Sequence, residues 1–211
     1  MVKRSAFLRE VVGYIKSGDE EGIELFFRSH PDEIPSRTPF AGGTWLHYAA
    51  EVGNVGVLRR LIDVGFDPNQ GGYQEGEVAL VRACDSAKIE NVESLLSARS
   101  RMDTSVSVRN PLFAAIVGQS PEIVQLLLDR GIDAAVRYNS DTMKDMDATA
   151  FALWRGKKVL AHIIAFHLAK RNEVEAQALL KHASEVVARN EPLAVVRISP
   201  SVEGTDQIDD E

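Results

Sequence analysis

The stretch from Thr44 to Asn69 reads TWLHYAAEVGNVGVLRRLIDVGFDPN and carries most of the information about the fold. Apolar residues recur before and after the glycine at position 53, and a second glycine at position 65 follows the second run. Apolar residues on both sides of a short break predict two helices joined by a turn. Because such a pair cannot bury its apolar stripe alone, it is expected to stack on neighbours of the same kind.

Copies of this pattern follow at intervals of 32 to 37 residues. The second copy lacks the two glycines and has Ala87 and Arg99 in their places. The third, NPLFAAIVGQSPEIVQLLLDRGID over residues 110–133, has Phe113 where the first has His47, and the fourth spans 147–165 after a longer connection. Small residues recur in each predicted first helix, at Ala49, Ala83, Ala115 and Ala152, and would let successive helices approach closely.

The two ends of the repeated region read as caps. Residues 5–30 fit the same frame in divergent form, with Gly18 aligned to Gly53. After Ile164 the frame ends, and apolar residues at helical spacing predict one further helix over 173–190. The stretch LAVVRISPSV after Pro192 is expected to form a short strand or to lie across the surface, and the acidic end is expected to be flexible.

On these residues the chain resembles the ankyrin repeat, whose signature joins T-P-L-H-x-A to an apolar second helix and a glycine turn. Trp45 stands where that signature has proline. The resemblance implies an all-α ankyrin-repeat solenoid of about five helix–turn–helix units, the first degenerate, with hairpin loops and a C-terminal capping helix. The expected divisions are a single repeat domain over 1–190 and an acidic tail over 191–211. Within the domain we expect a cap repeat over 1–35, repeats over 36–69, 70–103, 104–133 and 134–168, and the capping helix over 173–190.

Composition limits the classes of partner. The chain has 24 basic and 31 acidic residues, and five of the acids lie in the last nine residues. Without those five, 24 basic and 26 acidic residues give a net charge of −2. This balance disfavours nucleic acid, whose phosphates are bound by dense basic faces. No apolar run reaches the roughly 20 residues that span a bilayer, so no membrane association is expected. Cys84 is the single cysteine, which rules out an internal disulfide and leaves the cytoplasm as the expected location.

No constellation of residues predicts catalysis, a metal site or a cofactor. Histidines 162, 167 and 182 are spaced by five and fifteen residues, whereas ligands on one helix face need a spacing of three or four. Cys84 falls at a core position of the repeat and is expected to act as a small apolar residue. The acids at 141, 145 and 147 are expected to be solvated loop residues. The resemblance gives His47 a structural role, in which it ties neighbouring turns together by hydrogen bonds.

Ankyrin-repeat proteins bind through hairpin tips and exposed positions of the first helices, and this family property yields a set of candidate partner-binding residues. Phe151 occupies the position in its predicted first helix that is equivalent to Tyr48 and Arg82 in theirs. Aromatic and arginine side chains are favoured as binding anchors. The candidates are Arg37, Phe40, Tyr48, Glu51, Tyr73, Glu75, Arg82, Asp85, Tyr138, Asp141, Lys144 and Trp154. Rings that fold back to cover the helices are the alternative, above all for Phe151 and Trp154.

The sequence therefore predicts a non-catalytic module that binds another protein. The short all-repeat architecture is similar to small bacterial ankyrin-repeat proteins, some of which are immunity proteins that neutralise a toxin of the same cell. We expect a function of that kind, with a basic toxin or enzyme as the partner, a monomer when alone and a heterodimer when bound. The alternative is a general adaptor or scaffold, or a secreted effector that engages host proteins.

Overall fold

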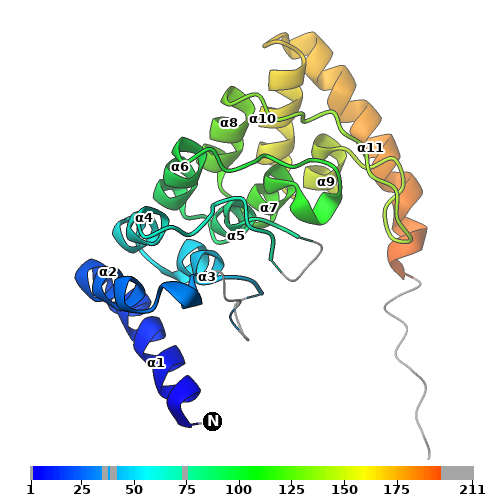
Figure 1. The fold of residues 1–211 in the computed structure, drawn as a ribbon. Coiled ribbons are helices and arrows are strands. Elements are labelled where there is room, and N and C mark those ends of the chain that lie inside the picture. The colour runs from blue at the N-terminus through cyan, green and yellow to red at the C-terminus, as the bar shows by residue number, and fades with distance from the viewer. Residues whose placement is uncertain (1, 35–37, 39–41, 73–75, 196–211) are drawn as a thin grey trace, which may run out of the picture.

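The computed structural model describes residues 2–34, 38, 42–72 and 76–195, and over these residues it contains eleven α-helices and two short 3-10 helices (Figure 1). No strand occurs in this described part, where Tyr138 and Met146 form an isolated antiparallel bridge. The predicted all-helical fold of stacked helix pairs is confirmed. The helices are α1 (Val2–Ser17), α2 (Glu20–Ser29), α3 (Trp45–Val52), α4 (Val55–Asp63), α5 (Ala79–Asp85), α6 (Ile89–Ser97), α7 (Pro111–Val117), α8 (Pro121–Asp129), α9 (Ala148–Trp154), α10 (Lys158–Leu168) and α11 (Glu173–Val195), with 3-10 turns η1 (Pro31–Glu33) and η2 (Ser107–Arg109).

The helix pairs stack along one direction in two layers (Figure 1). The first helices α3, α5, α7 and α9 contact one another in sequence and form the inner layer. The second helices α4, α6, α8 and α10 do the same and form the outer layer. Helix α11 packs on α9 and α10, and α1 with α2 covers the opposite end of the stack. None of the described helices is both long enough and apolar enough to cross a lipid bilayer.

Short polar side chains fix where many of the helices begin. Asn54, Asn110, Ser120 and Asp147 each accept a hydrogen bond from a backbone N–H two or three residues further on. These bonds satisfy donors that the first turn of a helix leaves without an internal partner. Helices α7 and α8 also start with proline, whose missing N–H is not needed at that position.

Small and aliphatic side chains fill the core as their spacing predicts. The recurrent alanines at 49, 83, 115 and 152 are fully buried, so the inner-layer helices can lie close together. Leu61, Leu95, Leu127 and Ile164 of the outer layer are fully buried as well. Cys84 is fully buried, and burial raises the pKa of its thiol far above the usual range. The expectation that this cysteine acts as a core residue is confirmed.

His47 joins two successive hairpins. Its Nδ1 atom lies 3.1 Å from the backbone nitrogen of Thr44, and its Nε2 atom lies 3.1 Å from the carbonyl oxygen of Glu77. The same carbonyl also accepts a hydrogen bond from the N–H of Gly72, at 2.6 Å. The structural role that the sequence assigns to this histidine is confirmed.

Helix α11 is longer than the sequence predicts. It ends at Val195 rather than at residue 190, so the stretch expected to be strand or surface cover is helical at its start. Asn190 anchors this helix to the loop before α9, since its side chain accepts from the backbone N–H of Lys144 at 2.7 Å and donates to the carbonyl of the same residue at 2.9 Å. The remainder of the predicted tail, residues 196–211, lies outside the described residues.

Candidate protein-binding surface

A groove of about 410 Å³ crosses the inner layer over α5, α7 and α9. The 3-10 turn η2 and the loop around Met143 form its sides. Its apolar lining comes from five separate segments and comprises Val81, Val108, Phe113, Ala114, Val117, Met143, Phe151 and Trp154. We call this feature the groove. Because each of its segments starts from a packed helix or a bonded hairpin, the surface is already formed in the isolated chain.

Stacked aromatic rings make the floor of the groove. The rings of Phe113 and Phe151 are nearly parallel, with centroids 4.3 Å apart, and Trp154 lies 6.1 Å from Phe151. Phe151 is only 8% exposed, so it packs against its neighbours instead of projecting outward. Trp154 keeps part of its indole in solvent, and Val108 and Val117 are 46% and 37% exposed. Exposed apolar side chains beside buried rings are the composition of a protein-binding site.

Charged residues gather at the α5 end of the groove. The guanidinium of Arg82 lies 2.7 Å from the carboxylate of Glu77 and 3.8 Å from that of Glu51. Glu77 is buried, and burial raises the pKa of its carboxyl, while the charge and hydrogen bonds of Arg82 act in the opposite direction. Asp85 follows one turn later on α5 and is exposed. This end of the groove is therefore polar and carries more acids than bases.

Tyr138 is buried, whereas the sequence predicts an exposed residue at a hairpin tip. Its ring is buried edge-on against Phe113, with centroids 5.0 Å apart. Its hydroxyl donates to the carbonyl oxygen of Thr104 at 2.8 Å and accepts from the side-chain amide of Asn110 at 2.9 Å. The prediction of this residue as a partner contact is wrong, because the ring and the hydroxyl are both used inside the molecule. In this repeat the phenol ties two hairpins together, as His47 does in the first.

The other predicted site residues fall into three groups. Arg82, Asp85 and Trp154 line the groove, and Glu51 flanks it through its ion pair with Arg82. Tyr48 is half-buried against Trp45 on α3, while Asp141 and Lys144 are exposed in the loop before α9. The remaining four candidates lie outside the described residues; they are Arg37, Phe40, Tyr73 and Glu75.

Most residues that line the groove are missing from the predicted set, Val108 and Met143 among them. Val108 and Met143 lie in hairpin segments whose neighbours are mostly polar, and both line the groove. Apolar residues isolated in polar hairpins are a signal that could have identified them, since nothing in such a loop requires an apolar side chain for local structure. The sequence therefore indicates that aromatic and charged side chains occur on this surface, but it does not identify which residues line the groove.

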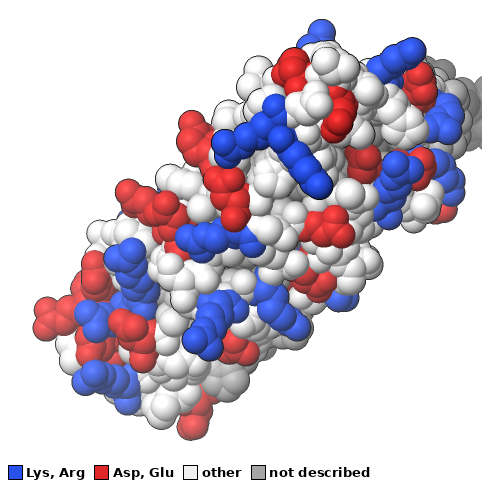
Figure 2. Space-filling view, turned by 90° about the horizontal axis from the view of Figure 1, so that it is seen from above, with Lys and Arg blue, Asp and Glu red and all other residues white. Residues whose placement is uncertain are grey.

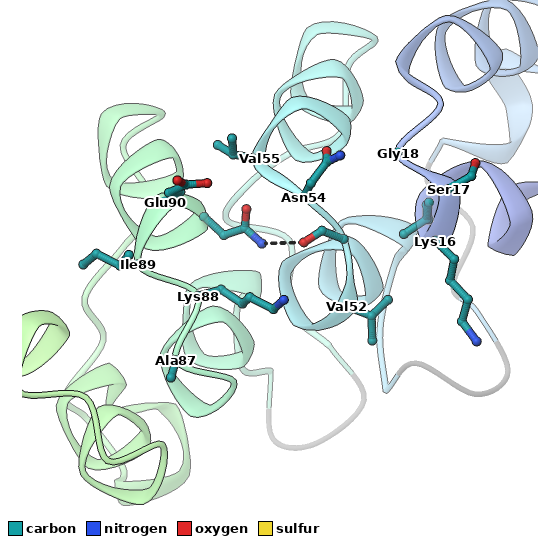
Figure 3. A pocket seen from close by; sticks show the side chains of 13 residues that line it. Lys16, Ser17, Gly18, Val52, Asn54, Val55, Ala87, Lys88, Ile89 and Glu90 are labelled. Atoms are coloured by element: carbon teal, nitrogen blue, oxygen red, sulfur yellow. Dashed lines mark hydrogen bonds between the residues drawn. The ribbon is translucent and has the colours of Figure 1, made fainter.

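A second hollow, of about 380 Å³, lies among the turns that join first and second helices (Figure 3). Lys16, Ser17, Asn54 and Lys88 supply much of its lining. Below them the amide of Asn91 donates to the carbonyl oxygen of Gly53 at 3.2 Å, the bond drawn in Figure 3, and also contacts the carbonyls of Ala49 and Ala50. These bonds satisfy carbonyls at the end of α3, so the buried amide has a structural role.

On the face seen from above, surface charge does not single out a binding site. On the side shown in Figure 2, acidic and basic side chains are interspersed across the molecule. Recognition sites for proteins combine a few large anchors, aromatic ones above all, with polar groups. Three aromatic side chains line the groove, whereas the apolar lining of the second hollow is aliphatic. The groove is therefore the candidate binding surface.

Comparison with known proteins supports the repeat assignment. The family model described as "Ankyrin repeats (3 copies)" matches residues 46–138. The chain is 28% identical over 130 residues to the "Transient receptor potential channel pyrexia" of Drosophila melanogaster. That match covers 61% of this chain and 14% of the relative. It is 28% identical over 163 residues to the "Ankyrin repeat and KH domain-containing protein mask-1" of Caenorhabditis elegans. That match covers 64% of this chain and 6% of the relative. This chain thus spans a small fraction of the length of either relative.

Proposed function

Since a family model of ankyrin repeats matches residues 46–138, we propose that the chain is a non-catalytic ankyrin-repeat module which binds another protein through the groove. The observation that carries the proposal is the groove itself, where Trp154, Val108 and Val117 remain accessible around a floor of packed rings. Ankyrin repeats form elongated stacks whose exposed inner surfaces bind proteins. A rigid surface loses little conformational freedom on binding, which favours tight complexes.

Two residues of types that often act in catalysis, Cys84 and His47, have structural roles in this fold. Cys84 is buried with a raised thiol pKa, so it is not poised as a nucleophile. His47 uses both ring nitrogens in the hairpin tie. These two residues support a binding function over a catalytic one.

Within this class the finer proposal is an inhibitor that neutralises a toxin, and it rests on the repeat architecture and on a preformed groove that could cover the active site of a toxin. The two relatives named above are animal proteins and lend it no support. A general adaptor, or an effector that engages host proteins, fits the same groove. We also propose that the chain is cytoplasmic, is monomeric when alone and forms a one-to-one complex with its partner.

The test is capture of proteins from the native source on immobilised full-length chain. Val117→Arg places a charge in the groove, and Val159→Arg places the same charge on α10, where Val159 is 68% exposed outside the groove. We expect a protein that the unmodified chain and Val159→Arg retain equally, and whose yield falls at least about tenfold with Val117→Arg, because the long charged side chain would occupy the groove and disrupt its apolar contact.

Two results would overturn the proposal: no protein retained above the bare support, or a retained protein whose yield is the same with Val117→Arg. Circular dichroism of both variants before the capture verifies that they are folded. A retained protein that is a toxin, and whose activity the chain blocks, would decide for the inhibitor over the adaptor.

A further inference from the structure

The α5 end of the groove has an excess of negative charge. The carboxylates of Glu77 and Glu51 lie 2.7 and 3.8 Å from the guanidinium of Arg82, and a third acid, Asp85, lines the same end of the groove. Arg82 is committed to Glu77, because its Nη2 and Nε atoms lie 2.7 and 2.9 Å from the same carboxylate oxygen. Its distance to the carboxylate of Glu51 is longer, at 3.8 Å. The charge of Arg82 is therefore largely matched by Glu77.

Asp85 is the carboxylate that faces solvent at this end. It is exposed, it lines the groove, and it makes no ion pair within the part of the chain that the structure describes. Arg82, the cation nearest to it on the same helix, is already paired. A cation brought by a partner would meet an acidic residue that needs no rearrangement to receive it.

The acidic end and the apolar part of the groove are adjacent. A Cβ atom on Gly118 would lie 2.6 Å from the carbonyl oxygen of Asp85, so the end of α7 rests directly against the end of α5. Val117, which precedes this glycine, is 37% exposed and lines the groove. An exposed acid and an exposed apolar side chain thus stand next to each other on one surface.

We propose that the groove takes a segment of a partner protein in which a lysine or arginine lies beside an aliphatic or aromatic side chain. This inference rests on the proposed function and names the chemistry of the partner. The apolar side chain packs on Val117 and Trp154, while the basic group pairs with Asp85. An acidic segment would be excluded, because like charges brought together at an interface oppose binding.

The test uses a display library of random twelve-residue peptides selected against the full-length chain. Peptides that also fail to bind Val117→Arg are groove-dependent. Among these we expect enrichment of lysine or arginine next to leucine, methionine or an aromatic residue. Asp85→Lys should weaken the selected peptides by at least about fivefold. Asp63→Lys makes the same change of charge at an exposed residue of α4 outside the groove, and should leave their affinity within about twofold.

A second measurement reverses both charges. Replacing the basic residue of a selected peptide with glutamate should abolish its binding to the unmodified chain and restore part of its binding to Asp85→Lys. Groove-dependent peptides without basic enrichment, or with equal affinity for Asp85→Lys, would overturn this inference and leave the proposed function standing. Peptides that bind Val117→Arg equally well, or a library without binders, would overturn both. Self-association of the chain that Val117→Arg abolishes would make a second copy the occupant and would also overturn the inference.

Discussion

The Nε2 atom of His47 lies 3.1 Å from the carbonyl oxygen of Glu77, 30 positions along the chain, so one imidazole joins two successive hairpins. A carbonyl oxygen can only accept a hydrogen bond, which places the ring proton on Nε2. The other ring nitrogen then accepts from the N–H of Thr44. Glu77 in turn supplies the carboxylate that holds Arg82 at the groove, so the tie between hairpins also positions the candidate binding surface.

Removing the imidazole should destabilise the fold. His47→Ala leaves the buried N–H of Thr44 without its acceptor and the carbonyl of Glu77 without one of its donors, and we expect a loss of about 2–3 kcal/mol in the free energy of unfolding. Urea denaturation measures it. His182→Ala, at an exposed position on α11, is the matched control and should change stability by less than about 0.5 kcal/mol. Equal effects of the two substitutions would contradict the structural role of His47.

The phenol of Tyr138 is expected to stabilise the hairpin beside the groove. Tyr138→Phe keeps the ring on Phe113 but removes the bonds to Thr104 and Asn110, and should lower stability by about 1–2 kcal/mol. Tyr14→Phe removes an exposed hydroxyl bond to Glu10 and serves as control, with an expected change below about 0.5 kcal/mol. Thermal unfolding of both variants compares them. A neutral Tyr138→Phe would mean that the hydroxyl bonds do not hold the hairpin.

A backbone conformation predicts a stabilising substitution. Arg99 has a φ of 62°, in the left-handed region, and occupies the position where the first and third repeats have Gly65 and Gly131 with φ of 114° and 81°. We expect Arg99→Gly to raise the free energy of unfolding by about 0.5–1 kcal/mol, since glycine adopts this conformation without steric penalty. Gly131→Ala is the converse variant, because a Cβ there meets open space and only the backbone is strained. It should be destabilising by about 1 kcal/mol. If both changes had the same sign in a urea titration, this explanation would fail.

Burial of Glu77 predicts a pH dependence. In the unfolded chain its carboxyl titrates near 4.5, and burial raises its pKa in the folded protein. Between these two values the folded protein holds a proton that the unfolded chain has lost, so the contribution of this group to stability is greatest at low pH and is lost as the pH rises through the folded pKa. Glu77→Gln removes the titration and keeps an oxygen that can accept from Arg82. The stability of the unmodified chain relative to this variant should therefore fall as the pH rises above about 4.5, and a constant or rising difference would contradict it.

The sequence predicts the fold well where one residue type performs one role. The spacing of Ala49, Ala83, Ala115 and Ala152 identifies the inner layer, because close helix packing admits few larger residues. The orientation of Tyr138 could not be predicted in this way. Phe113 replaces the histidine of the first repeat, and the ring that covers it comes from a loop residue 25 positions later, whose direction depends on how that loop closes.

The groove depends on the same kind of long-range placement. Trp154, Val117 and Met143 come from two helices and a loop, and only the stacking of repeats brings them together. Their residue types indicate a binding surface when taken one at a time, but the adjacency of Asp85 to the end of α7 is a property of the packed structure. The contact between Asn190 of α11 and the loop at Lys144 is likewise long-range, because 46 positions separate the two residues.

The central claim is that a partner protein occupies the groove, and the accessibility of Trp154 tests it most directly. The chain has two tryptophans, of which Trp45 is 1% exposed and Trp154 is partly exposed at the groove. Acrylamide should therefore quench the fluorescence of Trp154 and leave that of Trp45 largely unaffected in the free chain. In the complex with the captured protein, measured with a Trp154→Phe variant as the reference for Trp45 and the partner, we predict that Trp154 becomes protected. A stable complex in which Trp154 is quenched as readily as in the free chain would contradict the claim.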